Sequence, residues 1–143
     1  MSDHPVKDDC IFCKIIQGEM PAAVIAETSA VMAILDAFPA TRGHTLILPR
    51  GHYENLHDMP GDLLAACAEA SQKIARALAS AINPDGLALH QYNGAAAGQT
   101  IWHYHQHIIP RWHGQRPQAH GSTPADRDEL DELAAMIRDH LDW

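Results

Sequence analysis

The apolar positions of this 143-residue chain fall into short runs, which are typical of strands, and into longer stretches with helical spacing. Five short segments rich in apolar and β-branched residues are bounded by turn-forming residues, which is typical of strands. They lie at residues 23–27, 30–35, 44–49, 86–92 and 101–110. Thr28 and Ser29 leave room only for a tight turn between the first two segments, which predicts a hairpin.

The helical period is clearest in residues 60–82, where apolar side chains recur at steps of three and four. Pro60 suits the first turn of this helix, and Asn83-Pro84 would end it. A second helix is expected at about residues 124–141, with Thr123 as a possible N-cap and acidic residues in its first turn.

These elements predict an α+β fold: a largely antiparallel sheet of about five strands, one long helix and a C-terminal helix. Residues 10–18 add a short helical turn that ends at Gly18. The length suits a single domain over residues 1–143 with a hydrophobic core of its own.

The charge balance excludes one class of partner. Ten basic and eighteen acidic residues give a net charge of −8, which disfavours non-specific binding of nucleic acid but not of a small phosphorylated ligand. Residues 1–9 are polar, and no apolar run approaches the roughly 20 residues that span a bilayer. We therefore expect a cytoplasmic protein without a membrane segment, whose three cysteines are reduced thiols or metal ligands.

The pattern of greatest chemical interest is His103, His105 and His107, which occupy alternate positions of the predicted strand at 101–110. In a strand the three imidazoles would project from one face. Such a group suits a nucleophile flanked by helpers, with His105 attacking a phosphorus or carbonyl centre. It also suits a metal cage, because His-x-His on a strand is a common zinc arrangement. Three solvated surface histidines are the third interpretation.

The loop at residues 93–100 favours a phosphorus centre. Its glycines allow a backbone to approach an anion closely, and its short polar side chains add donors. The residues concerned are Asn93, Gly94, Gly98, Gln99 and Thr100. No Lys or Arg lies between Arg76 and Arg111, so neutral donors and imidazoles would have to hold the phosphate.

Cys10 and Cys13 form a Cys-x-x-Cys pair, a spacing that presents two thiolates to one tetrahedral metal. No second such pair follows, so histidines would have to complete the site. A thioredoxin-like redox pair lacks its βαβ context here, and two ordinary thiols are the remaining alternative.

Several separate motifs resemble the histidine triad (HIT) family in the same order along the chain. The segment His103-Tyr-His-Gln-His-Ile-Ile109 is similar to the family's His-φ-His-φ-His-φ-φ pattern (φ, apolar), with Gln106 in one usually apolar place. Segments 10–21, 35–36, 43–49 and 93–100 resemble its N-terminal, central-strand and phosphate-loop motifs. The resemblance covers about residues 10–112 and points to the nucleoside phosphoramidase branch, of the bacterial zinc-containing type.

The resemblance implies a nucleotidyl hydrolase or transferase. His105 would attack the α-phosphate of a nucleoside phosphoramidate or related adenylate, and water would release the nucleotide from His105. The implied catalytic residues are His105, His107, His44 and Thr100, and the implied nucleotide contacts are Phe12, Ile34, Asp36, Asn93, Gly98, Gln99, Thr100, His105 and His107. Asp36 would hold the ribose hydroxyls, and Ile34 stands where an aromatic wall of the base pocket is usual.

The resemblance also implies that His52 and His103 join Cys10 and Cys13 around a structural zinc, whereas catalysis would require no metal. It implies a purine nucleoside monophosphate, or its phosphoramidate or adenylate, as the ligand, and an edge-to-edge homodimer. A non-catalytic nucleotide-binding or scaffolding protein, a dinucleoside polyphosphate hydrolase and a metallohydrolase built on the triad are the alternative functions.

Overall fold

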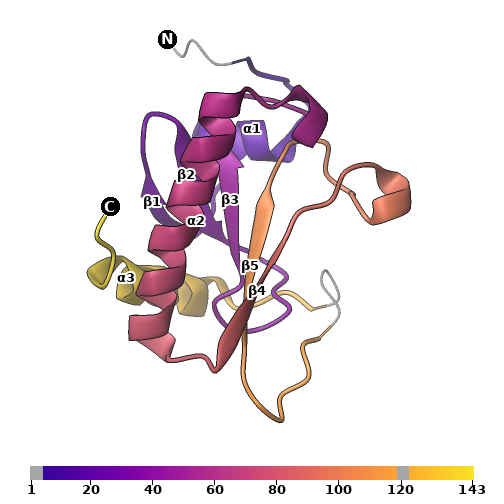
Figure 1. Ribbon diagram of the computed structural model, residues 1–143. Helices are drawn as coiled ribbons and strands as arrows, with labels where there is room; N and C mark the ends of the chain where they lie inside the picture. Colours follow the sequence, from indigo (N-terminus) through magenta and orange to yellow (C-terminus); the bar gives the residue numbers. More distant parts are fainter. Residues whose placement is uncertain (1–4, 119–122) are drawn as a thin grey trace.

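The computed structural model of the protein describes residues 5–118 and 123–143 and contains a five-stranded antiparallel sheet (Figure 1). The strand order is β1-β2-β3-β5-β4. The elements are α1 (Ile11–Ile16), β1 (Val24–Glu27), β2 (Val31–Leu35), β3 (Thr45–Pro49), the 3₁₀ turn η1 (Leu56–Asp58), α2 (Gly61–Ile82), β4 (Gly86–His90), the 3₁₀ turn η2 (Ala95–Ala97), β5 (Gln106–Arg111) and α3 (Arg127–Asp139). The predicted α+β class, the β1–β2 hairpin and the long helix are confirmed.

Each face of the sheet has its own apolar core, because successive strand residues point to opposite sides. Ala33 of β2 packs in the core shared with α2 and α3, while its neighbour Ile34 packs in the core beneath α1. In Figure 1, α2 crosses the front face of the sheet and α1 lies behind the sheet, on its other face. His107 lies opposite Leu46 in the β3–β5 register, and Leu46 belongs to the α1 core. His107 therefore projects from the face that carries α1.

The predicted strand at 101–110 is wrong over its first half, because β5 begins only at Gln106. The neighbouring strand β4 ends at His90, which pairs with His107, so it offers no partner to the residues before Gln106. The main-chain N–H of Tyr104 donates instead to the carbonyl of Tyr53 outside the sheet (2.6 Å). Of the three triad histidines, only His107 lies in a strand.

The C-terminal helix also begins later than predicted, at Arg127 rather than near residue 124, and it ends at Asp139. Asp126 rather than Thr123 is its N-cap, since the Asp126 carboxylate accepts from the main-chain N–H of Glu129 (3.1 Å). Within residues 5–118 and 123–143, no helix combines the length and the hydrophobicity that a membrane crossing requires.

Candidate active site

The triad histidines lie beside the aromatic ring of Phe12, on the α1 side of the sheet. Phe12 meets His103 and His105 edge-on, with ring centroids 5.8 and 5.1 Å apart. The rings of His105 and His107 are 4.8 Å apart. The side chains of His103, His105 and His107 are thus brought together although the first two precede the strand.

A hydrogen bond to the main chain fixes the tautomer of His105. Its Nδ1 lies 2.7 Å from the main-chain carbonyl oxygen of His103, which can only accept a hydrogen bond. Nδ1 therefore carries the proton, and Nε2 of the neutral ring is unprotonated. An unprotonated nitrogen on an oriented ring has the lone pair that a nucleophile requires.

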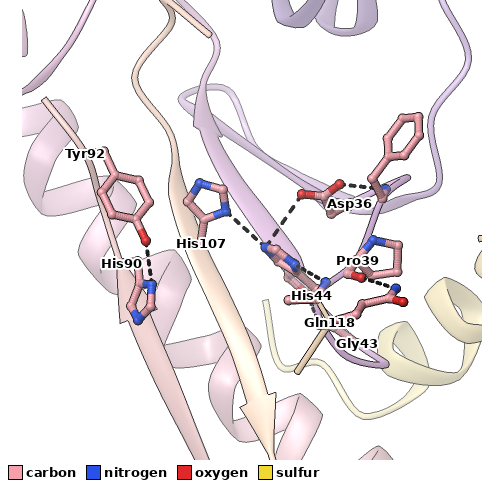
Figure 2. A network of polar contacts seen from close by, with 11 residues as sticks. Asp36, Pro39, Gly43, His44, His90, Tyr92, His107 and Gln118 are labelled. Atoms are coloured by element: carbon pink, nitrogen blue, oxygen red, sulfur yellow. Dashed lines mark hydrogen bonds and ion pairs between the residues drawn. The ribbon is translucent and has the colours of Figure 1, made fainter. Parts of the chain in front are cut away.

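A chain of hydrogen bonds orients the neighbouring His107 in the opposite way (Figure 2). The main-chain N–H of Ala40 donates to Nδ1 of the buried His44 (2.9 Å), so His44 carries its proton on Nε2. That Nε2 lies 3.0 Å from Nδ1 of His107 and 3.6 Å from Asp36. Because His107 accepts at Nδ1, its own proton sits on Nε2. His105 and His107 therefore offer a lone pair and an N–H donor side by side.

A cavity of about 420 Å³ opens next to these two imidazoles, within the size range of small-molecule sites. Its walls are mostly apolar and come from α1, β2, β3 and the segment that leads into α3. Six of the predicted site residues line it: Phe12, Ile34, Asp36, Thr100, His105 and His107. The cavity can hold a flat apolar group close to a carboxylate, a hydroxyl and two imidazoles.

The predicted phosphate loop uses two of its polar side chains to brace itself. The buried Gln99 amide donates to the carbonyl of Glu54 (2.7 Å), and its oxygen accepts from the N–H of Gly94 (2.9 Å). The Asn93 oxygen accepts from the N–H of Leu56 (2.8 Å). Neither Asn93 nor Gln99 lines the cavity.

Gly98 is exposed and does not line the cavity either, and its φ of +106° favours glycine. A Cβ at this position would lie 3.8 Å from the ring of Tyr92. Tyr92 packs against His107 with ring centroids 5.6 Å apart, on the opposite side from His44 (Figure 2). Of the predicted loop residues, Thr100 alone reaches the cavity lining.

A second cluster contains Cys10, Cys13, His52 and His103, whose candidate ligand atoms all lie within 4.8 Å of one another. Nδ1 of His103 is 3.4 and 3.6 Å from the two sulfurs, and Nδ1 of His52 is 3.4 Å from that of Cys13. Tetrahedral zinc with usual bond lengths separates a sulfur from a nitrogen ligand by about 3.6 Å. The four residues therefore fit a tetrahedral Cys₂His₂ site.

The protonation of this cluster also suits a metal. Nε2 of His103 donates to the Pro49 carbonyl (3.0 Å), which leaves Nδ1 with its lone pair toward the sulfurs. Burial lowers the pKa of His103 to about 4 and also lowers the pKa of His52, so both rings are neutral at pH 7. Burial raises the pKa of Cys13 to about 11, so a thiolate there needs a cation beside it.

The triad does not form a single metal cage. His103 groups with the two cysteines, whereas His107 groups with Asp36 and His44. His105 belongs to neither group among the described residues. This separation leaves the ring of His105 available for chemistry other than metal binding.

One wall of the cavity, which the C-terminal segment supplies, was not predicted from the sequence. Pro124, Ala125, Arg127 and Leu130 line it, and the N–H of Ala125 donates to the carbonyl of Ala37 next to Asp36 (2.9 Å). Arg127 is the one cation among the described lining residues. The helical period identified this segment only as the start of α3, because the period carries no information about what the helix packs against.

Comparison with known proteins identifies the family. The family model "HIT domain" matches residues 17–114. Adenylylsulfatase HINT3 of Arabidopsis thaliana is 39% identical over 142 residues, which cover 95% of this chain and 71% of that protein. A Hit-like protein involved in cell-cycle regulation from Bartonella henselae, crystallised with an unknown ligand, has a TM-score of 0.90 and 36% identity, covering 96% of this chain and all of that one.

A zinc-bound histidine triad family protein from Mycobacterium smegmatis has a TM-score of 0.82 and 36% identity, with 92% of each chain covered. The fold of the sheet and helices is thus shared with crystal structures over nearly the whole chain. Together with the family match over more than half of the sequence, these similarities show that the chain belongs to the HIT domain family.

Proposed function

We propose that this protein is a nucleotidyl hydrolase or transferase acting on nucleoside phosphoramidates or related adenylates through His105. The observation that carries the proposal is the pair of fixed tautomers beside an apolar cavity: a lone pair on His105 and an N–H donor on His107. The name of the Arabidopsis relative, an adenylylsulfatase, supports a nucleotide substrate attacked at phosphorus.

In the proposed reaction, Nε2 of His105 attacks the α-phosphorus, and the bond from phosphorus to the leaving group breaks. The leaving group departs with its electron pair and takes up a proton. Water then attacks the same phosphorus and loses a proton, which balances the one taken up by the leaving group; the phosphorus–His105 bond breaks, the nucleotide is released and the neutral imidazole is restored. The N–H of His107 and the hydroxyl of Thr100 would stabilise the charge on the phosphoryl oxygens.

The same proposal places the base and the ribose of the nucleotide in the rest of the cavity. The base would lie between the apolar walls that include Phe12 and Ile34, and Asp36 would accept hydrogen bonds from the ribose hydroxyls. His44 would act through His107, whose tautomer it fixes. Asn93, Gly98 and Gln99 would shape the phosphate loop through the contacts described above rather than by touching the nucleotide.

The test is His105→Ala with an adenosine phosphoramidate as substrate. We expect turnover to fall by about 10³-fold or more, and a labelled nucleotidyl-enzyme to be trapped on quenching the wild type but not the variant. His140→Ala, at the exposed end of α3, is the matched control and should keep wild-type turnover. Survival of turnover in His105→Ala would exclude the nucleophile, and binding of AMP without turnover in the wild type would identify a non-catalytic binding protein.

We propose further that Cys10, Cys13, His52 and His103 hold a structural zinc, and that the protein is cytoplasmic, where these thiols stay reduced. The zinc would tie the segment before α1 to the residues that follow β3 and add folding free energy. Cys10→Ser should lower the zinc content of the purified protein, measured by atomic emission, and lower its Tm. Cys67→Ser, away from the cluster, is the control for zinc content, and unchanged zinc in Cys10→Ser would remove the cysteines from the site.

We also propose a homodimer formed along β4. The opposite edge of the sheet is covered, because Arg138 of α3 donates to the carbonyls of Val24 and Ile25 in β1 (2.6 and 2.8 Å). Along β4, Leu87 and Leu89 are 39% and 55% exposed, and such an open edge favours pairing with a second chain. Leu89→Lys should halve the molar mass measured by light scattering, whereas Met136→Lys on α3 should not.

A further inference from the structure

Arg127 has a fixed place at the wall of the cavity. On one side of it the main-chain N–H of Ala125 is bonded to Ala37, and on the other side Leu130 is buried in the core between α3 and the sheet. Asp126 caps the helix that begins at Arg127. These anchors hold the main chain of Arg127 in place beside the cavity, whose lining includes this residue.

The guanidinium of Arg127 is oriented by a neighbouring carboxylate and is partly exposed, and both features suit contact with a ligand. Nε lies 3.1 Å from the Asp131 carboxylate one turn later in α3, which orients the planar group, and the side chain is 45% exposed. Within the described residues no other cation lines the cavity. An arginine plane is weakly hydrated and stacks readily on flat π systems.

Two phenylalanines line the cavity, Phe12 of α1 and Phe38 of the loop after β2, whereas β2 itself contributes only aliphatic side chains. Ile11, Phe12 and Ile15 of α1 line one side, and Ile34 of β2 contributes an aliphatic side chain. A planar heterocycle inserted here would contact aliphatic carbon on the β2 side and would gain further contact from a second planar group. Arg127 is the planar group that the C-terminal segment adds to this cavity.

We infer that Arg127 stacks on the base of the bound nucleotide and determines how strongly the base contributes to affinity. The inference rests on the proposed function, because it takes the ligand to be a nucleotide. It assigns the C-terminal segment a binding role: the Pro124–Leu130 stretch is the outer wall of the base pocket. The recognition is by the π face of the base, so it should be stronger for purines than for pyrimidines.

The test compares ligands with and without a base. In calorimetric titrations, Arg127→Ala should weaken AMP by about three- to ten-fold while leaving ribose 5-phosphate unchanged. Arg127→Lys, which keeps the charge but loses the plane, should weaken AMP about as much as Arg127→Ala. Arg116→Ala removes the same charge from an exposed position outside the cavity lining and should match the wild type for both ligands.

Each other result overturns the inference. Equal weakening of AMP and ribose 5-phosphate, or full recovery by Arg127→Lys, would assign Arg127 a charge contact with the phosphate instead of stacking. Unchanged AMP affinity in Arg127→Ala would remove it from the site while leaving the proposed function standing. A wild type that binds neither ligand would refute the proposed function and this inference together.

Discussion

Gln106 departs from the apolar pattern of the family, and we expect its hydrogen bond with Tyr104 to contribute to the free energy of unfolding. Its side-chain oxygen accepts from Ser71 of α2, and its amide donates to the hydroxyl of Tyr104 (2.9 Å). Tyr104 is 3% exposed, so water cannot replace a lost partner there. This network joins α2 to the two residues on either side of His105.

The expected energies follow from which groups lose a partner. Gln106→Leu leaves the Tyr104 hydroxyl without its donor, while Ser71 keeps the Cys67 carbonyl (2.8 Å). One buried polar group without a partner costs about 1–3 kcal/mol, so we expect Gln106→Leu to lower the free energy of unfolding by about 2 kcal/mol. Tyr104→Phe should cost a similar amount, because the Gln106 amide then lacks its acceptor.

The double variant separates this explanation from simple loss of packing. Gln106→Leu with Tyr104→Phe removes both ends of the hydrogen bond, so its free energy of unfolding should lie within about 1 kcal/mol of the wild type. Urea unfolding at constant zinc, followed by far-UV circular dichroism, gives the three values. If the double variant loses the sum of the two single losses to within about 0.5 kcal/mol, the two side chains are independent and the reasoning is wrong.

Three further outcomes can be measured on the same protein. Phe12→Ala should lower the free energy of unfolding by about 3–5 kcal/mol in urea, since Phe12 is buried against two imidazoles; a loss below about 1 kcal/mol would contradict that packing. Burial raises the pKa of Cys67 to about 12, so mass spectrometry should find it unalkylated by iodoacetamide at pH 8 until urea is added; rapid native alkylation would count against its burial. Arg138→Met should cost about 1–3 kcal/mol of unfolding free energy by removing two bonds to β1 carbonyls, whereas Arg116→Met should cost nothing measurable.

The parts of the fold that depend on local pattern could be predicted from the sequence. The apolar period of residues 60–82 and the short apolar runs bounded by turn residues predicted the elements found at α2, β1, β2 and β3. The start of β5 could not be predicted in this way, because it depends on where β4 ends and on the hydrogen bond from Tyr104 to Tyr53. Strand pairing is a property of two segments, and the spacing within one segment does not contain it.

For the site, too, residue types could be read from the sequence, but the directions of the side chains could not. Residue type and order were enough to single out His105, His107 and the Cys-x-x-Cys pair as candidates, which the structure places at the cavity and in the Cys–His cluster. They could not show that the side chains of Asn93 and Gln99 turn back onto the chain to brace the loop. Nor could they show that Arg127 reaches a cavity lined by residues about a hundred positions earlier, since only tertiary packing brings the two together.

The separation of the triad into two tasks depends on the chain leaving the sheet before Gln106. The Pro49 carbonyl at the end of β3 accepts from Nε2 of His103, which aims Nδ1 at the cysteine sulfurs. The main-chain carbonyl of His103 accepts in turn from Nδ1 of His105, which leaves Nε2 unprotonated. In the proposed function, His103 would thus carry a metal ligand on its side chain and the acceptor that orients the proposed nucleophile on its main chain. A metal in the Cys₂His₂ cluster would therefore contribute to catalysis by holding His103 in place, without itself contacting the phosphate.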